Sequence, residues 1–346
     1  MHGLLGRTLG TLLPAGGLAL VLVLAGIPSG AAAEPAVQLP PSDRETPNED
    51  DATLLASPTT IDHIGRVVVP VMVNGQGPFR FIVDTGASHS TISPDLVRRL
   101  GLTPGQAPSI LLDGITGSAQ VSAVTVDRLE AGRMSVEDVA LPVVWAPLMA
   151  GADGILGAAG LSDQSLVVDF RRNRVVISAT VEPAVRAAAM RIHAMRQTDG
   201  LMTVSTMVGG VRVRTVIDTG SERSLANLAL RNALGPPPGP GVGARVTTVY
   251  GATKQVEPGE VRVAPMIAIE RLRIADVQLV FGNFHIFKVW GMENEPAMII
   301  GMDVLGTVES LGIDFKSHDV YLTSSRATGG DALSAARAYG SDKARR

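Results

Sequence analysis

The sequence contains no cysteine among its 346 residues, which excludes disulfide bonds, thiolate nucleophiles and cysteine-ligated metals. Its six histidines lack the spacing typical of metal ligands, such as a His pair four residues apart around a Glu. We therefore expect no metal and no cofactor. The net charge of −3 lacks the positive excess typical of nucleic-acid binding, so no nucleic-acid partner is expected. Aromatic residues make up only 3% of the chain, which argues against pockets lined by large aromatic side chains.

Glycine and proline are abundant, with 38 and 22 residues, and valine and threonine are frequent. This composition favours short strands joined by turns over long helices. Apolar residues make up 45% of the chain and charged residues 18%, which allows a sizeable core. The length suits one bilobal unit or two modest domains.

Residues 1–33 have the features of an export signal peptide. Arg7 supplies positive charge, an apolar stretch is strongest over 18–27, and three alanines at 31–33 offer a small-residue cleavage site. The alternative is an uncleaved membrane anchor, although Pro14 and nearby glycines interrupt the apolar stretch. We expect an exported, periplasmic protein, with a secreted or signal-anchored form as alternatives. Membrane contact is expected only if this segment is not cleaved.

The informative feature is an internal repeat with an offset of 134 positions, the separation of Asp84 from Asp218. At this offset Asp84-Thr85-Gly86 falls on Asp218-Thr219-Gly220. A single Asp-Thr-Gly is weak evidence because an Asp-Gly turn after a strand is common. Here the flanks match as well: Gly75 with Gly209, Ser90 with Ser224, Leu96 with Leu230, Gly101 with Gly235, and Gly117 with Gly251.

Each copy predicts a β-hairpin whose second strand ends at the aspartate. In the first copy the strands cover 66–73 and 79–83, and in the second they cover 201–208 and 211–217. The glycine after each Asp-Thr is expected to allow a positive φ and a close backbone approach. A short helix should follow in both copies, with Ser93 or Asn227 at the N-cap and a glycine at the stop.

Both halves continue with an apolar-apolar-Gly segment, at 153–157 and 298–303, and then a strand that contains an aspartate. The offset has grown by about ten residues at this point, which indicates an insertion around 287–295 in the second half. We expect lobes at 61–180 and 199–325.

Three segments fall outside these lobes. The alanine-, methionine- and arginine-rich segment 181–198 predicts a helical connector between them. The Pro-rich, polar residues 34–60 predict a disordered linker, and 326–346 a disordered tail.

These motifs resemble those of the pepsin and retropepsin aspartic proteases over about residues 61–325. Two similar halves resemble tandem retropepsin-like domains more than a pepsin. The resemblance implies an all-β, bilobal acid protease fold with two pseudo-symmetric β lobes and short helices. It also implies a catalytic dyad of Asp84 and Asp218, one from each lobe. The residues that would support the dyad are Thr85, Gly86, Thr219 and Gly220, with the two threonines exchanging hydrogen bonds between the loops.

The resemblance also implies flap hairpins over the cleft. Pepsins have one flap, on the N-terminal lobe, whereas this sequence has candidate flap residues in both halves. They are Ile115, Thr116 and Gly117 in the first half and Tyr250 and Gly251 in the second. The residues after the two glycines differ, Ala87-Ser88 against Ser221-Glu222, so the two sides of the cleft are chemically unequal.

The sequence thus predicts a monomeric aspartic endopeptidase that hydrolyses extended protein or peptide substrates with a water molecule activated by Asp84 and Asp218. The alternative is a catalytically silent peptide-binding protein of the same fold in the cell envelope. Loss of one aspartate would favour that alternative, but both are present. A purely structural envelope module is a further alternative, and no motif in the sequence supports it.

Overall fold

The computed structural model describes residues 65–105, 107–144, 149–197, 200–236 and 245–324. Four short strands nearer the N-terminus are described as well: β1 (Leu18–Leu20), β2 (Leu24–Ala25), β3 (Ser57–Pro58) and β4 (Thr60–Ile61). Most of the predicted signal peptide and linker, and all of the predicted tail, lie outside the described residues. Within the described part of the chain, no helix combines the length and apolarity needed to cross a lipid bilayer.

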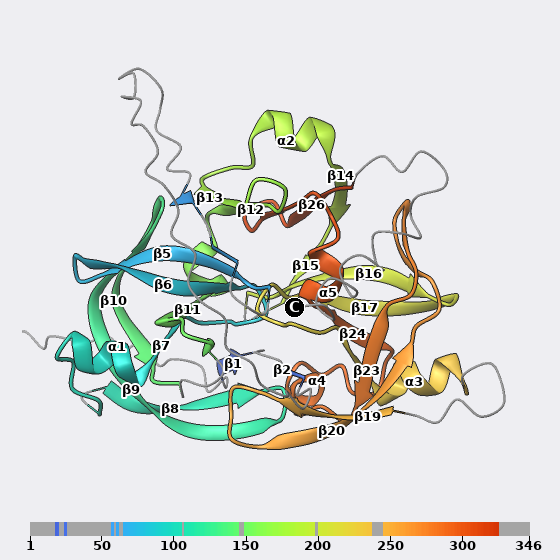
Figure 1. Ribbon diagram of the computed structural model, residues 1–346, viewed down its shortest axis with the longest axis horizontal. Coiled ribbons are helices and arrows are strands. Elements are labelled where there is room, and N and C mark those ends of the chain that lie inside the picture. Colours follow the sequence, from blue (N-terminus) through green and yellow to red (C-terminus); the bar gives the residue numbers. More distant parts are fainter. Residues whose placement is uncertain are drawn as a thin grey trace, which may run out of the picture.

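The first lobe is a β-sheet built around the strand that ends at Asp84 (Figure 1). Its strands are hydrogen-bonded in the order β1-β8-β9-β5-β6-β11-β7, with β10 on β9 and β4 on β5. The elements are β5 (Val67–Val73), β6 (Gln76–Asp84), β7 (Thr91–Ile92), α1 (Pro94–Arg99), β8 (Ala107–Gly114), β9 (Gly117–Ala131), β10 (Met134–Pro142), β11 (Gly154–Gly157) and a 3-10 helix, Ala158–Leu161.

The second lobe repeats this plan around the strand that leads to Asp218. The strand order is β2-β19-β20-β23-β18-β24-β17-β16-β21-β22, with β15 (Met195–Arg196) on β16. The elements are β16 (Met202–Val208), β17 (Val211–Ile217), β18 (Leu225–Asn227), α3 (Leu228–Leu234), β19 (Arg245–Tyr250), β20 (Val256–Val263), β21 (Ile267–Ile269), β22 (Leu272–Ile274), β23 (Gln278–Gly282), α4 (His285–Val289), β24 (Ala297–Ile300) and α5 (Met302–Leu305). The prediction of two β lobes with short helices is confirmed.

A third sheet joins the lobes, in the order β14-β26-β25-β12-β13-β3. At its centre β12 and β25, the matched strands that follow the apolar-apolar-Gly segments, pair antiparallel with Val167 opposite Gly312. Figure 1 shows this sheet, with α2 over it, at the end of the molecule away from β8 and β20. Its elements are β12 (Ser165–Asp169), β13 (Arg174–Ser178), α2 (Pro183–Ala188), β14 (Met190–His193), β25 (Ser310–Asp314) and β26 (Asp319–Thr323).

The connector between the lobes is helical only over α2. Within the segment predicted as a helix, 181–198, residues 190–193 form β14 and residues 195–196 form β15, because β14 completes the joining sheet against β26 and β15 pairs with β16. Tertiary strand pairing therefore overrides the helical propensity of its alanines and methionines.

The two apolar-apolar-Gly segments are the strands that lie beside the Asp-Thr-Gly turns. β11 runs parallel to β6 with Gly157 opposite Asp84, and β24 runs parallel to β17 with Ile300 opposite Ile217. The last four residues of β6 are all buried, as expected for a strand covered on both faces. This burial fixes where each strand delivers its aspartate.

The predicted helix caps are present in both lobes. The Ser93 Oγ accepts a hydrogen bond from the Leu96 backbone N–H at 3.1 Å, and the Asn227 Oδ1 accepts one from Leu230 N–H at 2.9 Å. Asn227 also binds the inserted segment, because its Nδ2 donates to the carbonyl oxygens of Met292 and Glu295 at 2.8 and 2.7 Å.

This difference predicts unequal costs for removing the two caps. Asn227→Ala loses the cap and leaves buried carbonyl groups without donors, so we expect a loss of about 2–4 kcal/mol in the free energy of unfolding. Ser93→Ala loses one capping bond and should cost about 1 kcal/mol. Urea denaturation of both variants measures the difference, and equal costs would contradict the bracing role of Asn227.

Candidate active site

The two Asp-Thr-Gly turns bring Asp84 and Asp218 together at the junction of the lobes, where both side chains are fully buried. One oxygen of each carboxyl, Oδ1, accepts a backbone N–H from the glycine two residues later, at 2.9 Å for Asp84 and 2.8 Å for Asp218. The other oxygen, Oδ2, is buried on both aspartates and has no hydrogen-bond partner among the described residues. Each carboxyl is therefore held by one oxygen and has the other available for a reactant.

Gly86 and Gly220 are required for steric reasons and not for an unusual φ. A Cβ on Gly86 would lie 2.5 Å from the Cγ of Asp218, and one on Gly220 would lie 2.2 Å from the Cγ of Asp84. Neither glycine has a positive φ, so that part of the sequence prediction is wrong. The close approach is what places each turn against the opposite carboxyl.

Thr85 and Thr219 exchange hydrogen bonds between the lobes. The Thr85 hydroxyl donates to the carbonyl of Ile217 at 2.6 Å and accepts the Thr219 N–H at 3.2 Å. The Thr219 hydroxyl donates to the carbonyl of Val83 at 2.7 Å and accepts the Thr85 N–H at 3.2 Å. Four buried hydrogen bonds thus lock the two turns in one relative position.

The environment of the pair favours protonated carboxyls. Burial raises the pKa of Asp84 from 3.8 to about 7, although the adjacent carboxyl of Asp218 and the backbone N–H groups of Gly86 and Ala87 oppose the shift. Burial also raises the pKa of Asp218 well above its ordinary value, and the charge of Asp84 adds to that rise. Two carboxyls in this setting share protons, because ionising both at close range is unfavourable.

Two hairpins cover the site, and each reaches into the opposite lobe. The first flap is the β8–β9 hairpin, and its tip residue Ile115 is fully buried in an apolar cluster of the second lobe that includes Val216 and Phe287. The second flap is the β19–β20 hairpin, whose Ala252 packs in a cluster of the first lobe with Ile82 and Ala87. Figure 1 shows the two hairpins along the same edge of the molecule.

The flap tips also bind each other. The Thr116 Oγ1 lies 3.3 Å from the Thr253 Oγ1 and donates to the Gln255 carbonyl at 2.8 Å, and the Gln255 Nε2 donates to the Ser118 carbonyl at 3.0 Å. Gly251 sits against Thr116 so closely that a Cβ would lie 2.7 Å from its Oγ1. In this structure the flaps are closed and interlocked.

Of the predicted flap residues, Ile115, Thr116, Gly117 and Gly251 therefore lie in the contacts between flaps and lobes. Tyr250 differs. Its side chain is 39% exposed, on the face of β19 opposite to the fully buried Val249. In the closed arrangement the Tyr250 ring thus faces solvent.

A cluster that the sequence analysis missed connects the first flap to α4. Asp113 and Ser118 form a cross-strand pair near the flap tip, and the Ser118 hydroxyl hydrogen-bonds the Asp113 carboxylate. The His285 Nε2 lies 2.8 Å from the Ser118 Oγ and 3.2 Å from the Asp113 Oδ1. One imidazole nitrogen serves both partners, which is not the arrangement of a nucleophilic triad, where serine and carboxylate use different nitrogens. The one available signal was that His285 borders the insertion in the second half.

The free edge of each flap strand is paired with a short strand from the N-terminal segment. β1 pairs parallel with β8, from Leu18 opposite Leu112 to Leu20 opposite Gly114. β2 pairs antiparallel with β19, with Leu24 opposite Tyr250. The backbone edges of both flaps can therefore take up an extended segment.

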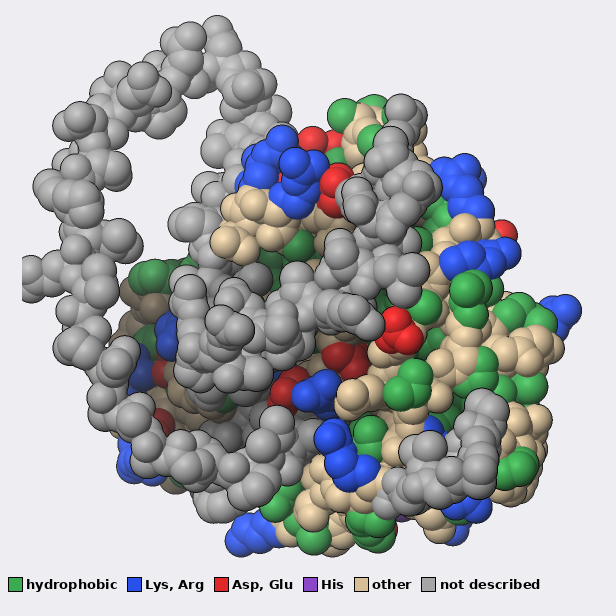
Figure 2. Space-filling view, turned by 45° about the vertical axis from the view of Figure 1, so that its right-hand side comes forward, with side chains coloured by type: hydrophobic (Ala, Val, Ile, Leu, Met, Phe, Trp, Pro, Cys, Tyr) green, Lys and Arg blue, Asp and Glu red, His purple; other side chains and the backbone are tan. Residues whose placement is uncertain are grey.

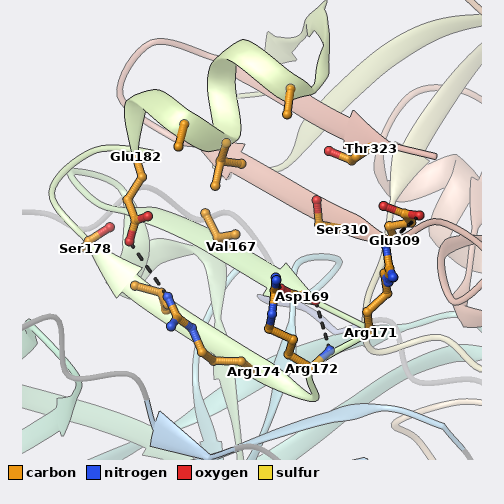
Figure 3. Close-up of a pocket in the computed structure, with 14 residues that line it drawn as sticks. Val167, Asp169, Arg171, Arg172, Arg174, Ser178, Glu182, Glu309, Ser310 and Thr323 are labelled. Carbon is orange, nitrogen blue, oxygen red and sulfur yellow. Dashed lines mark hydrogen bonds and ion pairs between the residues drawn. The ribbon is translucent and has the colours of Figure 1, made fainter. Parts of the chain in front are cut away.

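The cavity beneath α2 lacks chemistry comparable to that of the dyad. The cavity in Figure 3, of about 350 Å³, lies under α2, and the charges on its rim are paired, with Arg172 to Asp169 at 2.8 Å and Arg171 to Glu309 at 3.1 Å. Among the described residues no group of three or more His, Asp or Glu side chains could hold a metal ion. On the described surface in Figure 2, basic and acidic side chains are interspersed.

A family model described as aspartyl protease matches residues 69–159 and 204–304, more than half of the chain. This chain belongs to the aspartyl protease family. One matched segment falls in each lobe, and each contains one Asp-Thr-Gly turn, as expected for tandem halves of this family. A search of curated proteins found no significant match.

The raised pKa values predict that the dyad destabilises the fold as the pH rises. Between about pH 4 and pH 7 the folded protein keeps a proton on Asp84 that the unfolded chain has lost, so the free energy of unfolding falls with rising pH across that window. Replacing both aspartates by asparagine should remove this loss, which is about 4 kcal/mol for Asp84 alone across the whole window. Denaturation at pH 5 and pH 8 tests it. A parent-to-variant difference that does not grow with pH would contradict the buried protonated pair.

The His285 contacts predict a local effect on the first flap. His285→Ala should raise amide hydrogen exchange in residues 107–123 by roughly tenfold, because a hydrogen bond to a charged group is lost from the closed flap. His285→Gln keeps a donor near the Nε2 position and should restore much of the protection. The control is His193→Ala, which removes a histidine 3.5 Å from Asp319 in the joining sheet. Equal protection in all variants would show that His285 does not hold the flap.

Proposed function

We propose that this family member is an aspartic endopeptidase with Asp84 and Asp218 as its catalytic residues. The observation that carries the proposal is the pair of fully buried carboxyls, one from each lobe, each held by Oδ1 with an unpartnered Oδ2. A purely structural buried carboxyl would be expected to have both oxygens satisfied. Here the unsatisfied atoms are the two that a reacting water and a carbonyl group would need.

The chemistry follows from one proton shared by two carboxyls. The ionised carboxylate takes a proton from a water molecule, whose oxygen attacks the carbonyl carbon of the peptide bond. The protonated partner donates its hydrogen to the carbonyl oxygen and stabilises the tetrahedral intermediate. The carboxyl that gained the water's proton then gives it to the leaving nitrogen, and the C–N bond breaks. As the C=O bond re-forms, a hydroxyl of the intermediate returns its proton to the other carboxylate. The dyad finishes with one proton, as it began.

The substrate we propose is an extended peptide lying between the flaps and the dyad. A strand that crosses a two-fold axis must run parallel to one symmetry-related edge and antiparallel to the other. The pairing of β1 with β8 and of β2 with β19 follows this rule within one segment of the chain. Main-chain pairing of this kind gives affinity for extended peptides with little dependence on side chains. Release of the interlocked flap tips would have to precede entry.

We propose further that the protein works as a monomer outside the cytoplasm, in the periplasm or as a secreted or anchored protein. The support for the location is the signal-like segment 1–33, with its apolar stretch and alanine-rich cleavage site. The support for a monomer is that a single chain supplies both halves of the dyad.

The deciding experiment is hydrolysis of a peptide library, made from denatured proteins, by the full chain and by Asp84→Asn and Asp218→Asn. Each substitution should lower kcat/KM by at least about 10²-fold, because each removes one partner of the proton exchange. Asp169→Asn is the matched control, since this carboxylate pairs with Arg172 in the joining sheet, and it should change activity less than twofold. Activity that survives either dyad substitution would falsify the proposed mechanism. Peptide binding by the parent protein without turnover would favour the silent binding protein instead.

The pH profile is a separate expectation. With the pKa of Asp84 raised to about 7, protonation of the free enzyme at lower pH removes the base, so kcat/KM should fall as the pH drops below about 7. A maximum at strongly acidic pH would contradict a dyad buried to this extent.

A further inference from the structure

The two aspartates face different neighbours across their hairpins. In the first lobe β5 pairs antiparallel with β6, with Val68 opposite Ile82, and continuing this register by two residues places Arg66 opposite Asp84. In the second lobe Thr203 lies opposite Val216, which by the same step places Leu201 opposite Asp218. One carboxyl therefore lies across from a cation and the other across from an apolar side chain.

Burial makes this difference matter. Arg66 is fully buried and is the largest of the fully buried side chains among the described residues. Leu201 is 1% exposed. Residues directly opposite each other in an antiparallel pair project on the same face, with Cβ atoms about 4.5–5.5 Å apart. A charge acts more strongly there than at the surface, because water does not screen it.

Apart from Arg66 and the mutual interaction of the two carboxyls, the influences on Asp84 and Asp218 are matched. Both are fully buried, and the backbone N–H groups of Gly86 and Ala87 lower the pKa of Asp84 as those of Gly220 and Ser221 lower that of Asp218. The charged groups acting on Asp84 are Asp218 from the opposite turn and Arg66, the residue before β5, and Arg66 lowers the pKa of Asp84. In the second lobe the carboxyl of Asp303 is engaged by the N–H and hydroxyl of Ser224.

We propose that Arg66 is a positioning residue that makes the dyad unequal: once the pair has lost its first proton, Asp84 carries the negative charge and Asp218 holds the remaining proton. Combined with the peptidase activity proposed above, on which this inference rests, the assignment gives each aspartate one role. Asp84 takes the proton from the water, and Asp218 donates to the carbonyl oxygen of the substrate. A symmetric pair would have no such preference.

The test measures each aspartate alone, which removes the coupling between them. The γ-carbon of Asp84 is titrated by ¹³C NMR in the Asp218→Asn protein, and that of Asp218 in the Asp84→Asn protein. We expect Asp84 to titrate at least about one pH unit below Asp218, which is roughly a tenfold difference in the ionisation equilibrium. Arg66→Met should remove most of this difference and Arg66→Lys should retain it.

Leu201→Met is the matched control, because it changes the equivalent position without adding charge. It should leave the pKa values of both aspartates unchanged. If Arg66→Met does not fold, as judged by circular dichroism, Arg66→Gln replaces it. Leu201→Lys gives the converse measurement: it places a cation opposite Asp218, which should lower the pKa of Asp218. Equal titration of the two aspartates, or a difference that persists without the Arg66 charge, would overturn the proposal. Because no substrate is present, a protein that fails to hydrolyse peptides can still pass this test, so the two proposals fail separately.

Discussion

The position of the two catalytic turns depends on hydrogen bonds that Thr85 and Thr219 exchange across the lobe junction. Each hydroxyl donates to a backbone carbonyl of the other lobe and accepts an N–H from the opposite threonine. This exchange fixes the turns at a separation that only glycine tolerates at the next position, where a Cβ would overlap the opposite carboxyl. The two carboxyls are thereby buried together, although isolated burial of either would be unfavourable.

The scaffold is close to symmetric, and the parts attached to it are not. Matched strands β12 and β25 pair at the centre of the joining sheet, and both flaps send a tip residue into the opposite lobe. The helix α4, whose His285 contacts the first flap, belongs to the second lobe, and the register of the first hairpin, continued by two residues, places the buried Arg66 opposite Asp84. Two-fold symmetry brings equivalent oxygens together, and these departures from it give the two sides different tasks.

The same burial that raises the pKa values also excludes water from the charges involved. In such surroundings a proton moves between two fixed oxygens with little reorganisation of solvent. The closed flaps complete this enclosure, and their mutual contacts through Thr116 and Gln255 mean that admission of a peptide requires a conformational change. Stability, protonation and access are therefore set by one group of interactions at the lobe junction.

The sequence by itself determined the features that depend on neighbours close along the chain: the hairpins, the strand-end aspartates, the caps at Ser93 and Asn227, and the duplicated plan. Local hydrogen bonds and turn geometry are sufficient for these. Only the tertiary structure decided what lies far apart in sequence, such as the strands within the predicted helical connector, the tips that cross between lobes and the contact of His285 with Asp113. The tertiary structure also decided which side chain lies opposite each aspartate. A bulge between Val71 and Val73 shifts the register of the first hairpin, and a shift of one residue changes the side chain that faces the carboxyl.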